Sequence, residues 1–278
     1  MKKCILRILM LCLLIGCANN CFAEESVSYE EKVQYLKSIG CTDEYLEIRD
    51  TKTIEQVYEQ LVGKNVKFVD NVRVKQNANQ RSIPTGTIDD SMFFWEIGVF
   101  CEEDADGNMT ALDVEPYGRW IEMPINRLTD AVTVNWDSDL FSLNYFYVSA
   151  TGLAQLYDGT TEYIEYYNNE YPAYVTEGGV GYTAPISKNL YKNISVSSMI
   201  QLIPKAGAFT EGVEISVPII ATYYHQLIEL EVSFGVELGD GTLGGAGQVT
   251  IVDGEYDSAG TWANGTFIGL KLQAPGFS

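Results

Sequence analysis

Tyrosine and acidic side chains are concentrated in one short segment, between residues 161 and 182. A tyrosine ring offers a flat apolar face and a polar tip, and neighbouring carboxylates and amides add directional hydrogen bonds. Such side chains suit stacking on a sugar ring or contact with a protein partner. Tyrosines that simply pack along a sheet give the same pattern, which is the competing interpretation. The predicted ligand-binding residues are Tyr163, Tyr166, Tyr167, Tyr171 and Tyr174.

A second segment, residues 102–113, has the oxygen spacing of a calcium-binding loop. Its oxygen-bearing side chains match ligand positions of an EF-hand-like loop, and Gly107 stands at the position of the tight turn. The flanking residues alternate like strands rather than helices. A β-hairpin with Asp106-Gly107 at its tip is therefore the alternative. The predicted calcium ligands are Glu102, Asp104, Asp106, Asn108 and Asp113.

Paired carboxylates are the minimum requirement for a glycoside hydrolase, in which one acid protonates the leaving group and another attacks or activates water. Asp137 with Asp139, or Glu162 with Glu165, are candidate pairs, but the chain has 38 acidic residues to choose from. The single histidine, His225, is not part of any zinc-binding or serine-hydrolase motif. We expect it to be a strand residue, and we assign no catalytic residue.

Residues 1–26 have the composition of a bacterial export signal. Three basic residues precede an apolar run from Ile8 to Ile15, and small and polar residues follow. The run is much shorter than the ~20 apolar residues of a membrane-spanning helix. The signal can end after Ala23, or at Cys17, where Leu-Ile-Gly-Cys resembles the lipobox of bacterial lipoproteins. In the second case residues 1–16 are removed and Cys17 is lipidated, and both alternatives stay open.

Export also bears on the remaining cysteines and on the charge. In an oxidising compartment Cys41 and Cys101 are expected to form a disulfide, with two separate buried thiols as the alternative. The signal contains three of the 18 basic residues and none of the 38 acids, so the mature chain has a net charge of −23. This charge argues against nucleic-acid partners and anionic lipid surfaces. Membrane contact is expected only through a lipid anchor.

Helical signals are confined to the N-terminal part of the mature chain. Ser28 and Glu31 have the spacing of a capping box, and a second helix start is predicted at Thr53. A short helical turn is expected at 43–48. Each helix has one apolar stripe, so residues 24–64 should form a small cap that packs against the rest of the protein, or a spacer leading from the membrane.

Beyond residue 65 the apolar period changes to two, which is typical of strands. Met92–Cys101 is apolar on both faces and predicts a buried strand, whereas Leu227–Leu238 alternates like a half-exposed one. Turn dipeptides separate the runs, among them Asp106-Gly107, Asp158-Gly159 and Asn264-Gly265. The predicted fold is mainly β: an antiparallel β-sandwich, one large or two smaller, over residues 65–278, with a short N-terminal helical cap after an export signal at 1–23.

These observations predict an exported bacterial protein of the cell surface or extracellular space. Its expected role is non-catalytic binding or structural work with a glycan or protein ligand, without a cofactor other than the calcium considered above. The alternative is an extracellular carbohydrate-active enzyme that uses paired carboxylates.

Overall fold

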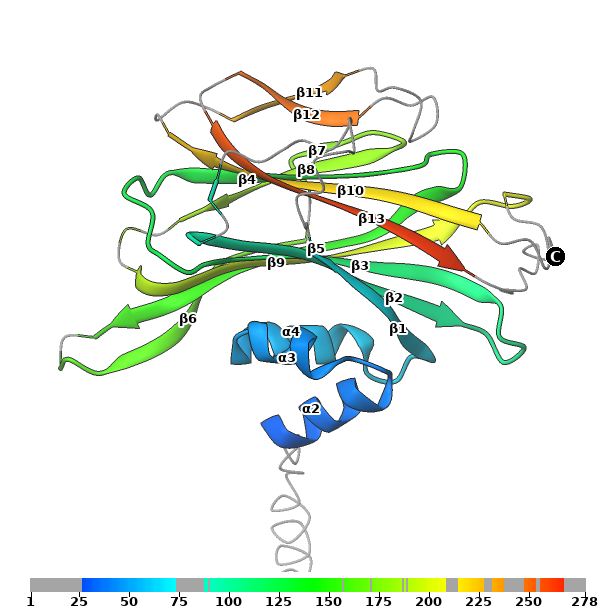
Figure 1. The fold of residues 1–278 in the computed structure, drawn as a ribbon, viewed down its shortest axis with the longest axis horizontal. Coiled ribbons are helices and arrows are strands. Elements are labelled where there is room, and N and C mark those ends of the chain that lie inside the picture. The colour runs from blue at the N-terminus through cyan, green and yellow to red at the C-terminus, as the bar shows by residue number, and fades with distance from the viewer. Residues whose placement is uncertain are drawn as a thin grey trace, which may run out of the picture.

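The computed structural model describes residues 27–73, 88–89, 91–156, 158–170, 172–186, 188, 190–208, 215–227, 232–237, 248–253 and 256–267. The predicted export signal with Cys17, and Tyr171, lie outside these residues. Figure 1 shows the described part as stacked layers, with helices below two sheets and a two-stranded ribbon above them. No helix in the described part is long and apolar enough to cross a membrane.

Three short helices form the lower layer, and a polar side chain caps the start of each one. Helix α2 (Tyr29–Ser38) begins after Ser28, whose capping box with Glu31 confirms the prediction. Helix α3 (Asp43–Ile48) confirms the short turn expected at 43–48. Helix α4 (Thr51–Leu61) begins after Asp50, which accepts the Thr53 amide hydrogen at 3.0 Å. The capping residue is therefore Asp50, three residues before the predicted Thr53.

Two antiparallel sheets form the sandwich, which confirms the predicted fold class. Sheet A contains, in spatial order, β1 (Val66–Arg73), β2 (Phe93–Glu103), β3 (Met109–Trp120), β9 (Leu190–Pro204), β5 (Phe141–Gln155) and β6 (Thr161–Asn169). Sheet B contains β13 (Tyr256–Phe267), β10 (Ile215–Gln226), β4 (Thr129–Trp136), β8 (Gly179–Pro185) and β7 (Tyr174–Val175). The ribbon pairs β11 (Ser233–Glu237) with β12 (Gln248–Asp253) and lies over β4 and β8.

Two sequence predictions of turns are confirmed and a third is wrong. Gly107 and Gly159 have positive φ angles of 82° and 83°, as tight turns between strands require. Asn264-Gly265 instead lies inside β13, paired with Val217 and Pro218 of β10. Within the predicted strand Leu227–Leu238, the described part forms a strand only over β11. A dipeptide preference is weaker than the pairing offered by a long neighbouring strand.

The central part of sheet A is buried on both of its faces, as β2 shows most clearly. Ile97, Val99 and Cys101 point into the main core between the sheets, whereas Phe100 belongs to a second core between sheet A and the helices. The second core contains one face of each helix and the outer side of sheet A, with members Leu36, Cys41, Tyr45, Leu46, Ile54, Val57, Leu61, Val66, Phe100 and Met199. The helices are therefore part of the folded body.

The predicted disulfide between Cys41 and Cys101 is not formed in the structure, where both residues are free, buried thiols. Successive residues of a strand point to opposite faces of the sheet. Cys101 therefore faces the main core, while its neighbour Phe100 faces the helices and Cys41. The strand separates the two thiols, and burial raises the pKa of each to about 12.

A buried guanidinium joins the helices to sheet A. Arg49, between α3 and α4, donates from Nε to Glu115 Oε1 at 3.0 Å and from Nη2 to Glu115 Oε2 at 2.5 Å. Its Nη1 bonds Glu96, and Tyr45 donates its hydroxyl to Glu115 at 2.7 Å. All three charged side chains are completely buried. Gly98 makes room for them, since a Cβ there would lie 2.8 Å from Glu115 Oε2.

We expect Arg49→Ala to lower the free energy of unfolding by about 3–5 kcal/mol, because it leaves two buried carboxylates without their cation. Chemical denaturation measures the loss. Lys37→Ala is the control, since it removes the exposed ion pair with Asp43 and should cost less than about 1 kcal/mol. Equal, small effects of both substitutions would contradict this role for Arg49.

Candidate binding surface

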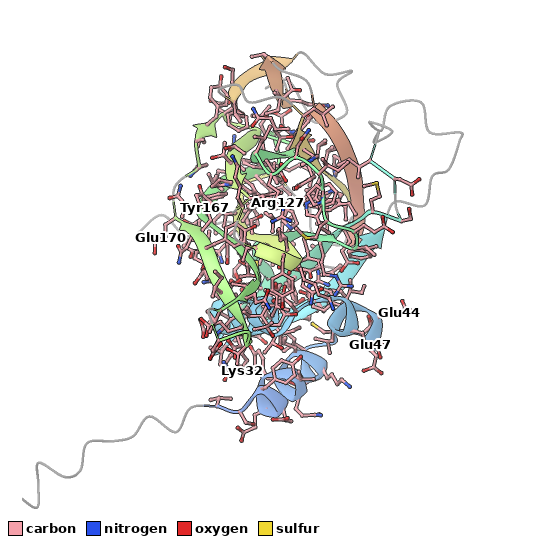
Figure 2. All side chains as sticks on the ribbon, turned by 90° about the vertical axis from the view of Figure 1, so that its left-hand side faces the viewer. Lys32, Glu44, Glu47, Arg127, Tyr167 and Glu170 are labelled. Atoms are coloured by element: carbon pink, nitrogen blue, oxygen red, sulfur yellow. The ribbon has the colours of Figure 1, made fainter. Side chains whose placement is uncertain are left out.

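Strand β6, which contains most of the predicted tyrosine surface, lies at one edge of sheet A, and β1 lies at the other. It pairs regularly with β5 from Thr161 opposite Gln155 to Glu165 opposite Thr151. A β-bulge follows, because Ala150 is opposite Tyr167 and Tyr166 has no direct partner. Figure 2 shows Tyr167 on one flank of the molecule, opposite the flank that bears helix α3. The structure therefore places this segment at an open edge.

Most of the predicted tyrosines are anchored in the protein rather than displayed on the surface. Tyr166 and Tyr167 are half-buried and pack against the main core. Within the described part of the chain the Tyr166 hydroxyl has no hydrogen-bond partner, and burial raises its pKa. Tyr163 accepts a hydrogen bond from the Asn193 amide at 2.9 Å. Tyr174 lies apart from them on β7, where it stacks on Phe234.

On its other face β6 contributes to a polar network that reaches the helices. Glu165 accepts hydrogen bonds from the Tyr147 hydroxyl at 2.9 Å, the Ser149 hydroxyl at 3.0 Å and the Gln56 amide at 3.1 Å. Gln56 is on α4, so this carboxylate ties the edge of the sheet to the helical layer. The sequence does not reveal these three partners of Glu165, because they are 16 to 109 positions away from it in the chain.

The two nominated carboxylate pairs lie in different local structures, a strand and a turn. Glu162 and Glu165 are three positions apart on a regular part of β6, so their side chains point to opposite faces of the sheet. Asp137 accepts the amide hydrogen of Asp139 at 2.8 Å within the turn after β4. That bond is a local turn feature. The structure therefore turns Glu162 and Glu165 away from each other and gives the Asp137 carboxylate a role in a local turn.

The predicted calcium ligands separate into two groups. Asp104 accepts the amide hydrogens of Asp106 and Asn108 at 2.9 and 2.8 Å, and so closes the hairpin between β2 and β3. Glu102 and Asp113 lie on the strands themselves. Within the described residues, no group of three or more His, Cys, Asp or Glu side chains could hold a metal ion. The structure forms the hairpin alternative instead of a calcium loop.

Glu102 and Asp113 form a carboxylate pair of a different kind. Lys64, which follows α4, lies 2.6 Å from Glu102 and 3.5 Å from Asp113. Gln201 of β9 donates to both, at 2.6 and 3.1 Å. Burial, followed by the hydrogen bond with Glu102, raises the pKa of Asp113 from 3.8 to about 7. Burial by itself would raise the pKa of Glu102, but hydrogen bonds from Asp113 and Lys64 outweigh burial and lower that pKa.

His225 lies on β10, as expected for a strand residue, and is almost completely buried. Its Nδ1 is 2.9 Å from Asp130, which also accepts the hydroxyl of Tyr223. Trp120 donates its indole hydrogen to that hydroxyl at 3.1 Å. Burial raises the pKa of Asp130 to about 6 although His225 opposes the shift. These contacts join β3, β4 and β10 within the sandwich, and they give His225 a structural position.

No protein-family model and no curated protein matches this chain. Among solved structures, the C-terminal domain of the Streptococcus agalactiae AgI/II polypeptide BspA is 14% identical with a TM-score of 0.28, over 48% of this chain. The chain spans about half the length of that domain, 54%. A pore-forming protein is 11% identical with a TM-score of 0.31, over 74% of this chain and 95% of its own. Such low TM-scores do not indicate a function for this chain.

We expect Asp113→Asn to flatten the dependence of stability on pH. Because folding raises the pKa of Asp113, its contribution to stability is present below pH 4 and is lost as pH rises towards about 7. Asparagine keeps the neutral state, so the variant should gain on the order of 1–2 kcal/mol relative to the wild type between pH 5 and pH 8. Denaturant titrations at both pH values test this. Asp106→Asn at the exposed hairpin tip is the control, and parallel pH profiles for all three proteins would refute the expectation.

Tyr166→Ala and Tyr167→Ala are each expected to lower the free energy of unfolding by about 2–3 kcal/mol, because both rings pack against the main core. Tyr191→Ala, at a side chain that is 38% exposed on β9, should change it by about 0.5 kcal/mol. Thermal and chemical denaturation measure the difference. Unchanged melting temperatures for both core variants would show that the rings do not support the fold.

Proposed function

We propose that the protein is an exported, non-catalytic binding protein of the cell surface or extracellular space, which contacts a glycan or protein ligand through β6. The signal-like residues 1–26 and the strongly acidic mature chain support export. Glu162 and Glu165 support a non-catalytic role, because their side chains point to opposite faces of β6 and lack the facing geometry that glycoside hydrolysis needs.

The observation that carries the proposal is the position of β6 at the edge of sheet A. Helices cover the outer face of sheet A, and the β11–β12 ribbon packs over β4 and β8 of sheet B. On β6, by contrast, Thr161, Glu162 and Asn168 are exposed, and Tyr163 is half-exposed beside them. Polar groups next to an amphipathic ring are typical of binding surfaces.

Binding is tested with purified residues 24–278 on an array of glycans and immobilised peptides. We expect the double substitution Glu162→Lys and Tyr163→Ala to weaken binding to any ligand found by at least about tenfold, since it removes a charge and a ring from the proposed surface. Glu177→Lys, in the exposed turn before β8, makes the same charge change away from β6 and should leave affinity unchanged. Equal affinity of wild type and the double variant would reject β6 as the contact surface.

A further inference from the structure

The backbone edge, the packed rings and the charges of β6 together indicate the chemical class of its ligand. This inference rests on the proposed function. We infer that the ligand is an extended polypeptide segment with basic residues, which adds as a further strand to the outer edge of β6 along Thr161–Glu165.

The first step concerns the backbone. Among the residues that the structure describes, β6 has a hydrogen-bonded neighbour, β5, on one side only. The outer edge of such a strand presents a row of N–H and C=O groups that can pair with another chain. The pairing with β5 is regular from Thr161 to Glu165, and the bulge at Tyr166 interrupts it. An added strand therefore has five regular residues to pair with.

The second step concerns the tyrosine rings. A sugar is recognised by an exposed, flat aromatic face. Tyr166 and Tyr167 instead pack on the main core, and the Tyr163 hydroxyl is bonded to Asn193. The rings thus hold β6 in place, and the peptide backbone is what the edge offers to a partner. Strand addition uses those backbone groups for affinity and the alternating side chains for specificity.

The third step concerns charge. Glu162 and Glu165 are both exposed and point to opposite faces of β6, so an added strand meets a carboxylate on each face. Opposite charges directly across a ladder stabilise the pairing, whereas like charges destabilise it. The complementary strand therefore has Lys or Arg at two positions three residues apart.

The same charges argue against a second copy of this chain as the partner. Two β6 edges would bring four carboxylates together along one short ladder, and each mature copy has a net charge of −23. Charged side chains on edge strands are a common device against self-association. With a basic partner strand, the repulsion between facing carboxylates is replaced by attraction between Lys or Arg and the two glutamates.

The test uses the capped peptide Thr-Lys-Val-Thr-Lys-Thr, which places lysines opposite both glutamates when it pairs antiparallel to β6. With millimolar peptide we expect amide hydrogen exchange in residues 161–165 to slow at least fivefold, without slowing in the outer strand β1. Glu162→Lys should weaken the peptide's affinity by about threefold or more. Glu177→Lys is the matched control and should have the affinity of the wild type.

Two further peptides separate strand addition from charge attraction. The peptide with glutamate in place of both lysines should not protect residues 161–165. The peptide with proline in place of valine keeps the charges but breaks the ladder, so equal protection by it would overturn strand addition. If no peptide protects β6 while the double variant of Glu162 and Tyr163 loses a glycan ligand, strand addition is wrong and the proposed function stands. If no ligand of any kind depends on β6, both fail.

Discussion

The architecture depends on the buried guanidinium of Arg49. The outer face of sheet A carries Glu96 and Glu115, two carboxylates that are completely buried. Removing such groups from water is costly unless a cation compensates them. Arg49 bonds both, and its guanidinium carbon lies 3.4 Å from the Tyr45 ring centre, as a cation–π contact requires. The helices therefore supply a charge that sheet A cannot do without, and they become its second core.

Because the helices and the ribbon cover the outer faces of the sheets, the proposed ligand contact is placed at a sheet edge. Sheet A packs on sheet B through an apolar face and on the helices through a mixed one. The ribbon is held to sheet B by Asn135, which bonds both the amide and the carbonyl of Val249. Layers joined by buried polar contacts do not separate at low cost. Strand β6 remains outermost, and Glu165 fixes it to α4 through Gln56.

Sequence reasoning succeeded where the determining contacts are local. The capping box of Ser28 with Glu31 and the hairpin turn at Asp106-Gly107 each involve residues a few positions apart. It failed where pairing between strands that are distant in the sequence decides the local structure or the direction of a side chain. The odd spacing of Glu162 and Glu165 places them on opposite faces once β6 is a regular strand, and Asn264-Gly265 pairs within a long ladder instead of turning.

By itself, the sequence determined the antiparallel β class, the N-terminal helices and the strong negative charge, because period, capping and composition are properties of short segments. Only the tertiary structure decided which charges meet. Arg49 is 47 and 66 positions from its two carboxylates, and Lys64 is 49 positions from Asp113. Likewise, whether Cys101 faces Cys41 depends on which layer covers each face of β2. Such pairings follow from strand order and register, which sequence periodicity leaves open.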